Sequence, residues 1–131
     1  MPNDNSGHAE ILIVEDNVFE MIAIKGMLEG YQYKCDSAMS AFEAFKMIQD
    51  RINAGQVMYK LILIDYKMPN CNGAEATAMI KSLLIDYDNK WPYIACLSNF
   101  NEISIKKSVI RAGVDVFLSK PIFKVGIYRL L

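Results

Sequence analysis

The chain has 131 residues, of which 53% are hydrophobic and 22% are charged, and its formal net charge is −1 at pH 7. This length and balance predict a single globular domain with a substantial core rather than a disordered chain. Lysine and arginine are spread along the sequence, which argues against a surface that binds nucleic acid. No apolar run approaches the roughly 20 residues that cross a bilayer, so we expect no membrane insertion by this chain.

The first ten residues are polar and lack the hydrophobic core of a signal peptide. We therefore expect a disordered lead-in over residues 1–10 and a cytoplasmic location. The three cysteines, Cys35, Cys71 and Cys96, are scattered and form no CxxC pair, which fits a reducing compartment. Cys35 and Cys96 lie in apolar stretches and are expected to be buried.

Five short apolar runs alternate with amphipathic segments, and this order predicts a parallel sheet with helices on both faces. The expected strands are Ile11–Val14, Tyr31–Asp36, Leu61–Ile64, Tyr93–Leu97 and Val116–Leu118. The expected helices run from Asn17 to Gly30, from Ser40 to Gly55, from Gly73 to Leu84 or Ile85, from about Asn101 to Gly113, and over Ile122–Leu131.

Residue types and spacing also predict how the first two helices begin and which face each one buries. Asn17 and Ser40 are expected to be their N-caps. The predicted buried side chains are Val18, Ile22 and Leu28 in the first helix, and Phe42, Phe45, Ile48 and Ile52 in the second.

Polar side chains follow directly where four of the expected strands end. Glu15 and Asp16 follow the first strand, Asp65 the third, Ser98 the fourth and Lys120 the fifth. Because a doubly wound parallel sheet brings these ends to one edge, we expect all five groups in one cleft. Three carboxylates in one place require a compensating cation, which is Lys120, a metal ion or both.

The chemistry of these groups indicates metal-assisted phosphoryl transfer onto an aspartate. Oxygen ligands without histidine or cysteine suit Mg²⁺, which fills its coordination shell with water and phosphate oxygens. Asp65 is the candidate nucleophile, since carboxylates form aspartyl-phosphate intermediates. Ser98 and Lys120 are placed to hold other oxygens of the phosphoryl group. The plainer alternative is that the acids are solvated loop residues and Ser98 a turn or cap residue.

Four motifs stand in order along the chain, each at an expected strand end: ILIVEDN (Ile11–Asn17), LILIDYKMPNCNG (Leu61–Gly73), CLSN (Cys96–Asn99) and AGVDVFLSKP (Ala112–Pro121). In these motifs the chain resembles the receiver (response-regulator) domains of two-component phosphorelays. It is most similar to the receivers attached to hybrid sensor histidine kinases. The resemblance implies a five-stranded, flavodoxin-like receiver domain over residues 11–131, with a last helix that is short or truncated.

The resemblance also implies a role for individual residues in a His-Asp phosphorelay. Asp65 would accept a phosphoryl group from a phosphohistidine on a histidine kinase or on a histidine phosphotransfer protein or domain. Asp16 and Asp65 would bind Mg²⁺ through their side chains, Lys67 through its backbone carbonyl, and Glu15 largely through water. Chemistry would be limited to self-catalysed transfer and autodephosphorylation, so the chain itself is not expected to be an enzyme.

Further implications concern the response to phosphorylation. Ser98 and Lys120 would contact the phosphoryl group, Ser98 and Phe117 would form the switch, and Lys120–Pro121 would be a cis peptide. A homodimer through the fourth helix, fifth strand and fifth helix is compatible with the resemblance, as is a membrane-anchored parent kinase. Asn99 stands where receivers usually have alanine. We expect Asn99 and the flexible cation of Lys67 to tune the lifetime of the aspartyl phosphate.

Three other functions were weighed against this one. A pseudo-receiver would keep the fold and bind proteins without phosphorylation, but the complete set of acceptor, acids, hydroxyl and lysine argues against it. A flavodoxin-like FMN carrier is disfavoured because Glu15 and Asp16 would repel a phosphate in the first loop. A haloacid-dehalogenase-like phosphatase needs a second acid two positions after Asp65, where this chain has Lys67.

Overall fold

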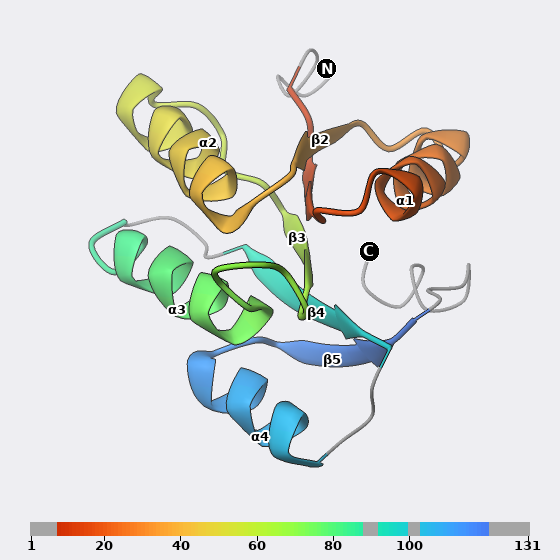
Figure 1. Cartoon of the computed structure of the whole chain (residues 1–131). Helices are drawn as coiled ribbons and strands as arrows, with labels where there is room; N and C mark the ends of the chain where they lie inside the picture. The colour runs from red at the N-terminus through yellow and green to blue at the C-terminus, as the bar shows by residue number, and fades with distance from the viewer. Residues whose placement is uncertain (1–7, 88–91, 100–102, 121–131) are drawn as a thin grey trace.

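The computed structural model describes residues 8–87, 92–99 and 103–120. Five parallel strands form one sheet in the order β2-β1-β3-β4-β5 (Figure 1). The strands are β1 (Ile11–Val14), β2 (Cys35–Ala38), β3 (Leu61–Asp65), β4 (Tyr93–Ser98) and β5 (Val116–Ser119). The helices are α1 (Val18–Gly30), α2 (Ala41–Ala54), α3 (Gly73–Leu83) and α4 (Ile103–Ala112). The predicted doubly wound parallel architecture is confirmed.

Some expectations lie outside the described residues. These are residues 1–7 of the lead-in, the final helix over Ile122–Leu131, and the peptide bond between Lys120 and Pro121. Within the described ranges, no helix has the length and apolar character needed to cross a membrane.

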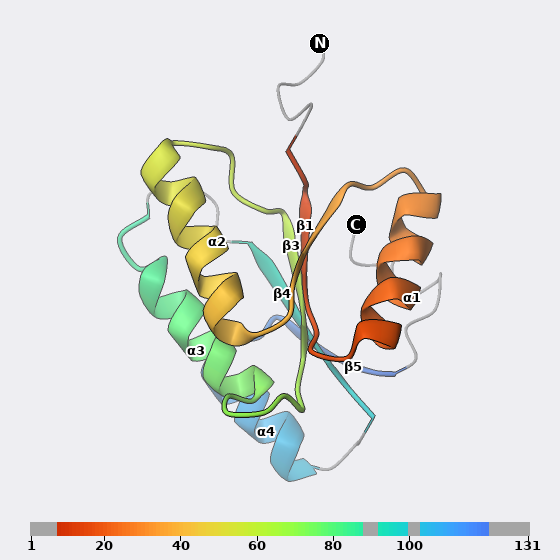
Figure 2. The ribbon, with the colours of Figure 1, turned by 45° about the horizontal axis from the view of Figure 1, so that its top comes forward.

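Helices cover both faces of the sheet, which explains the uniformly apolar strands. Helix α1 lies against one face, and α2, α3 and α4 lie against the other (Figure 2). Along β1, Ile11 and Ile13 pack toward α1, whereas Leu12 and Val14 pack toward the other layer. Since side chains alternate along a strand, burial on both faces requires an apolar residue at every position.

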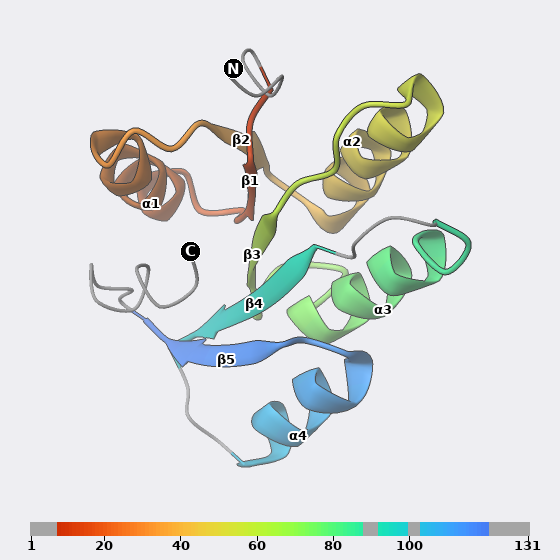
Figure 3. The same ribbon diagram turned by 180° about the vertical axis from the view of Figure 1, so that it is seen from behind.

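The strand order places the candidate site at a reversal in the sheet. From β1 the chain crosses to β2 on one side, and from β2 it returns to β3 on the other, so β1 and β3 are neighbours at the centre (Figure 3). Val14 is in register with Ile64, so the residues after these positions emerge side by side. A crevice beyond the strand ends at such a reversal is where ligands bind in open α/β sheets.

The predicted caps of the first two helices are confirmed, but the predicted buried face of α1 is correct only for Leu28. Asn17 accepts a hydrogen bond from the Glu20 N–H (3.0 Å), and Ser40 caps α2 in the same way. In α1, Val18 and Ile22 are 53% and 63% exposed, and the buried side chains are Met21, Ile24 and Leu28. Apolar residues lie on nearly every face of α1, so their spacing alone did not determine which face packs against the sheet.

The predicted face of α2 is correct only in part. Ile48 is buried, but Phe42 is 69% exposed, and the helix meets its neighbours through Ala41, Ala44 and Arg51. Small alanines allow a close approach that a phenylalanine would prevent. Burial of Arg51 is tolerated because its charge is paired within the fold.

Strand β2 begins later than predicted, at Cys35 rather than Tyr31. The residues before it complete the end of α1: the N–H groups of Tyr31 and Tyr33 donate to the Leu28 carbonyl at 3.0 and 3.1 Å. Gln32 adopts the left-handed conformation (φ 70°) that turns the chain. These N–H groups are therefore not available for hydrogen bonds to a neighbouring strand, which explains why β2 begins later.

Candidate functional site

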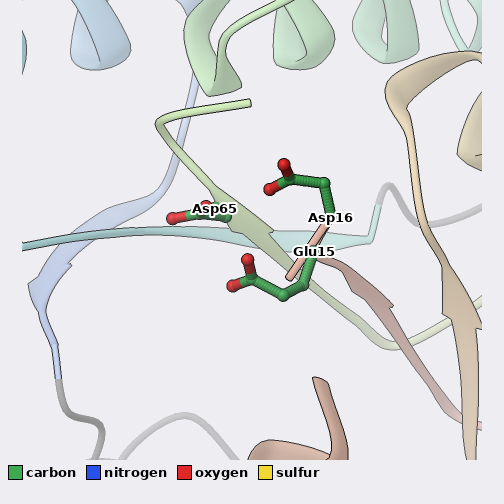
Figure 4. A group of neighbouring side chains, drawn as sticks. All are labelled: Glu15, Asp16 and Asp65. Atoms are coloured by element: carbon green, nitrogen blue, oxygen red, sulfur yellow. The ribbon is translucent and has the colours of Figure 1, made fainter. Parts of the chain in front are cut away.

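Three acids meet at the carboxyl ends of the two central strands. Glu15 and Asp16 follow β1, and Asp65 is the last residue of β3. One carboxylate oxygen from each lies within 4.8 Å of those from the other two (Figure 4). Glu15 and Asp65 are only 1% and 6% exposed, so two of the three negative charges are largely removed from water.

Local hydrogen bonds fix the β1–α1 connection that carries two of these acids. The Glu15 N–H donates to the Ala38 carbonyl at 3.0 Å, which ties the end of β1 to β2. The Glu15 carboxylate accepts from the Asn17 N–H at 3.2 Å. Because Asn17 is also the N-cap of α1, the helix starts at a defined point beside the acids.

The connection from β3 to α3 is equally constrained. Asn72 and Glu75 form a capping box at the start of α3, a feature that the sequence prediction missed. The Gly73 N–H donates to the Tyr66 carbonyl at 2.7 Å. A Cβ atom at Gly73 would lie 2.9 Å from both the Asp65 carbonyl oxygen and the Tyr66 Cα. Only glycine permits this close approach of α3 to the strand end.

Lys120 supplies the positive charge among the acids. Its Nζ lies 2.8 Å from Asp65 Oδ1 and 3.1 Å from Glu15 Oε1, and it also pairs with Glu20. The side chain is only 7% exposed. The Lys120 N–H donates to the Ser98 carbonyl at 2.8 Å, which holds the end of β5 against the end of β4.

Burial and mutual charge shift the pKa values of these groups. Burial, with the charge of Asp65, raises the pKa of the Glu15 carboxyl to about 7, against the opposing effect of Lys120. Burial also raises the pKa of Asp65, although the Lys120 ammonium opposes the shift. Burial alone would lower the pKa of Lys120, but its hydrogen bonds to Asp65 and Glu20 and the surrounding charges raise it. The lysine therefore stays charged and favours ionised acids beside it.

The remaining predicted residues surround this cluster at different depths. Ser98 is buried at the end of β4, the strand next to β3. Phe117, on β5, is partly buried and packs against the core cluster shared with α2, α3 and α4. Lys67 and Asn99 are exposed and border the same cavity. The switch and lifetime roles expected for these residues stay predictions.

Glu20 belongs to the cluster, and the sequence prediction did not include it. It lies in the first turn of α1, and its carboxylate pairs with the Lys120 ammonium. The sequence signal that could have identified Glu20 was its position three residues after the N-cap Asn17. That position is in the first turn of a helix that begins beside the strand ends. The sequence does not show how α1 is rotated about its axis, so a side chain at that position could equally have faced solvent.

The donor set fits a hard divalent cation. A cavity of about 520 Å³ covers the strand ends, and its lining residues are Glu15, Asp16, Asn17, Glu20, Asp65, Lys67, Met68, Pro69, Asn99 and Lys120. The acids offer only oxygen ligands, which Mg²⁺ prefers, and the cavity has room for water and a phosphoryl group. Burial first, and then the neighbouring charge of Asp65, raises the pKa of Glu15, and a bound cation would oppose both effects.

Comparison with known proteins identifies the family. Residues 11–130 match the family model of the response regulator receiver domain. The chain belongs to this family. The doubly wound parallel sheet and the acids at the ends of β1 and β3 agree with that assignment.

Similar proteins include several histidine kinases. The osmosensing histidine protein kinase SLN1 of Saccharomyces cerevisiae is 33% identical, over 90% of this chain and 9% of that protein. The hybrid signal transduction histidine kinase F of Dictyostelium discoideum is 32% identical, over 86% of this chain and 10% of that protein. The chain thus spans about a tenth of the length of these kinases. The predicted likeness to receivers of hybrid kinases is confirmed.

Solved structures agree with the fold. The receiver domain of the histidine kinase CKI1 from Arabidopsis thaliana, complexed with Mg²⁺ and BeF₃⁻, superposes with a TM-score of 0.81 and 25% identity. The alignment covers 93% of this chain and 89% of that one.

Proposed function

We propose that this chain accepts a phosphoryl group from a phosphohistidine onto Asp65, with Mg²⁺ bound beside it. One observation carries the proposal. The Asp65 carboxylate lies at the end of the central strand, with the acids of the β1–α1 connection on one side and the Lys120 ammonium 2.8 Å away. This arrangement places a nucleophile, a cation site and a fixed positive charge around one point.

The transfer step needs Asp65 to be ionised and accessible. A bond forms between an Asp65 carboxylate oxygen and phosphorus while the bond from phosphorus to the donor imidazole nitrogen breaks. The imidazole nitrogen keeps the electron pair and takes up a proton. Lys120 favours the ionised carboxylate against the effect of burial, and the cavity over the strand ends admits the donor.

Asp16 and Asp65 would hold Mg²⁺ through their side chains, Lys67 through its carbonyl and Glu15 through water. The ion, when bound, neutralises charge on the oxygens of the transferring phosphoryl group. Lys120 would hold another of these oxygens, because its ammonium already lies beside Asp65.

Phosphorylation would then be read out through Ser98 and Phe117. Ser98 ends β4 and Phe117 lies on β5, in register with Cys96 of β4. A hydroxyl that turns toward a new phosphoryl oxygen would leave its present place, and Phe117 would follow inward. The readout would alter the surface of α4 and β5, where a partner or a second copy would bind.

A histidine kinase or a histidine phosphotransfer protein is the donor that this chemistry requires. The alignment with hybrid kinases supports a place in such a relay. We further propose that the chain acts in the cytoplasm and turns over no substrate other than its own phosphoryl group. A phosphorylation-independent binding module, the alternative, has no need of the buried acids and their lysine.

Phosphoramidate, a small donor with a phosphorus–nitrogen bond, tests the proposal directly. We expect the intact chain to gain one phosphoryl group with Mg²⁺ and none after chelation with EDTA, measured by intact mass spectrometry. Asp65→Asn should abolish the gain because the amide is not a nucleophile. Asp50→Asn, which removes an exposed carboxylate from α2, should label like the natural chain.

Two results would count against the proposed function. Equal labelling of Asp65→Asn would show that another residue is the acceptor. Absence of labelling, together with no binding of Mg²⁺ at millimolar concentration, would favour the pseudo-receiver.

A further inference from the structure

Every donor of the Lys120 ammonium is engaged in the structure. A lysine ammonium has three N–H groups. Three carboxylates surround Lys120 Nζ: Asp65 Oδ1 at 2.8 Å, Glu15 Oε1 at 3.1 Å, and Glu20 Oε1. A phosphoryl oxygen that binds this ammonium must therefore displace one of the three.

The three partners differ in the cost of their release. The side chains of Glu15 and Asp65 are 2% and 7% exposed, whereas that of Glu20 is 39% exposed. A buried carboxylate that loses its cation is left without water, which is strongly unfavourable. The Glu20 carboxylate can be hydrated when it is released, so its displacement costs least.

The surroundings of Glu20 also permit it to move. Its N–H is held by Asn17 Oδ1 at 3.0 Å, so the backbone is fixed and only the side chain needs to turn. The residue borders the cavity over the strand ends and also a second cavity of about 230 Å³ beside α1. Among the described residues, Glu20 therefore borders a cavity on two sides.

We infer that Glu20 is the exchangeable partner of Lys120. It holds the ammonium beside Asp65 before phosphorylation and gives up its place to a phosphoryl oxygen afterwards. Glu20 is thus a positioning residue, and it lowers the affinity of the site for a phosphoryl group by competing for Lys120. This inference rests on the proposed function and adds to it a residue that sets how tightly the phosphoryl group is held.

Beryllofluoride, which mimics a phosphoryl group on a carboxylate, measures this competition. Its affinity is measured by titration calorimetry at saturating Mg²⁺ for the natural chain and three variants. Glu20→Gln should bind beryllofluoride about three- to tenfold more tightly, because a charge-assisted hydrogen bond that competes for Lys120 is lost. Glu29→Gln, which removes an exposed charge at the other end of α1, should leave the affinity unchanged.

Glu20→Asp separates positioning from a general effect of charge. It keeps the negative charge but shortens the side chain by one methylene, so it loses reach toward Lys120. We expect it to tighten binding nearly as much as Glu20→Gln. A purely structural role in the first turn of α1 would instead lower the melting temperature of the variants without changing their affinity.

Two outcomes would overturn the inference. If Glu20→Gln binds beryllofluoride as the natural chain does, Glu20 does not compete for Lys120. If Glu20→Asp behaves like the natural chain while Glu20→Gln binds more tightly, the effect is one of charge and not of contact. Failure of the natural chain to bind the probe with Mg²⁺ would overturn the proposed function itself.

Discussion

The Asp65 carboxylate is nearly excluded from water, and its reactivity depends on the charges that surround it. Burial favours its protonated form, whereas the Lys120 ammonium at 2.8 Å favours the ionised form that a nucleophile needs. Glu15 and Asp16 add negative charge that a cation must offset. Glu15, Asp65 and Lys120 therefore shift one another's pKa values.

We expect Glu15 to make the Mg²⁺ affinity of the proposed site depend on pH near neutrality. Its raised pKa of about 7 means that it takes up a proton as the pH falls below that value. The protonated acid no longer contributes a negative charge to the site. We expect the Mg²⁺ affinity, measured by calorimetry from about pH 8 to about pH 6, to decrease as the pH falls. Below the pKa of Glu15 the decrease should be at most about tenfold per pH unit.

Glu15→Gln provides the control for this pH dependence. The variant cannot ionise at that position, so its Mg²⁺ affinity should be weaker at high pH and should depend less on pH over the same range. A natural chain whose affinity stays constant between these pH values would contradict the raised pKa.

At the scale of single residues, the sequence identified the acids, Ser98 and Lys120 as strand-end residues. The structure pairs Lys120 with Glu15 and Asp65 and places Asp16 beside these two acids. The sequence did not reveal Glu20 as a site residue, because Glu20 does not follow a strand. Its carboxylate reaches Lys120 only because α1 is rotated with Met21 and Ile24 inward. Helix rotation depends on packing against the sheet, which local spacing does not encode.

The connection from β3 to α3 positions Asp65, the proposed acceptor, through a very close backbone contact. Gly73 begins α3 directly against Asp65 and Tyr66, and the Asn72–Glu75 capping box fixes that start. The strand end is thereby held between its neighbour β4 and the first turn of a helix. This explains how a short connection can keep a reactive side chain in place.

Gly73→Ala should destabilise the fold at this contact. The added methyl group would lie 2.9 Å from backbone atoms that cannot turn aside, so we expect a loss of about 1–3 kcal/mol in the free energy of unfolding. Chemical denaturation measures the loss. The same variant should also label more slowly at Asp65, because the strand end must shift.

Gly26→Ala is the matched control. Gly26 lies within α1, and an added Cβ would meet nothing within 4 Å. Alanine is favoured over glycine inside a helix, so this variant should be about 0.5–1 kcal/mol more stable. Equal effects of the two substitutions would contradict the close contact at Gly73.

The elements themselves were largely predictable, because buried parallel strands and capped helices have strong local signals. Asn17, Ser40 and Gly55 mark helix ends in the sequence and in the structure. The start of β2 was not predictable in the same way. The aromatic residues Tyr31 and Tyr33 favour a strand, but their N–H groups complete the end of α1.

Across the whole molecule, the amino ends and the carboxyl ends of the strands differ in how their charged side chains are paired. At the edge opposite the acids, the Arg51 guanidinium donates to Asp36 at 3.3 Å and lies 3.6 Å above the Tyr59 ring. The Tyr59 hydroxyl donates to the same carboxylate at 2.7 Å, and Arg51 also binds the Val57 carbonyl. This network joins α2, β2 and the entry to β3, and it balances its charges.

The carboxyl ends of the strands differ because, among the described residues, four acids lie around the cavity there with only two lysines, Lys67 and Lys120. Glu15, Glu20 and Asp65 pair with the Lys120 ammonium, and Asp16 lies beside Glu15 and Asp65. One edge is thus neutralised within the fold, whereas the other keeps negative charge that a metal ion would balance. The order of strands and helices predicted that the acids gather at the carboxyl ends of the strands, but the Arg51 network joins residues too distant in sequence to be predicted.

Reductive trapping of the phosphorylated chain tests the central claim most directly. An aspartyl phosphate is reduced by borohydride to homoserine, and peptide mass spectrometry then locates the modified position. After reaction with phosphoramidate and Mg²⁺, we expect homoserine at position 65 and unmodified acids at Glu15, Asp16 and Glu20. Reduction at any of those acids, or a phosphoryl group that resists borohydride, would contradict Asp65 as the acceptor.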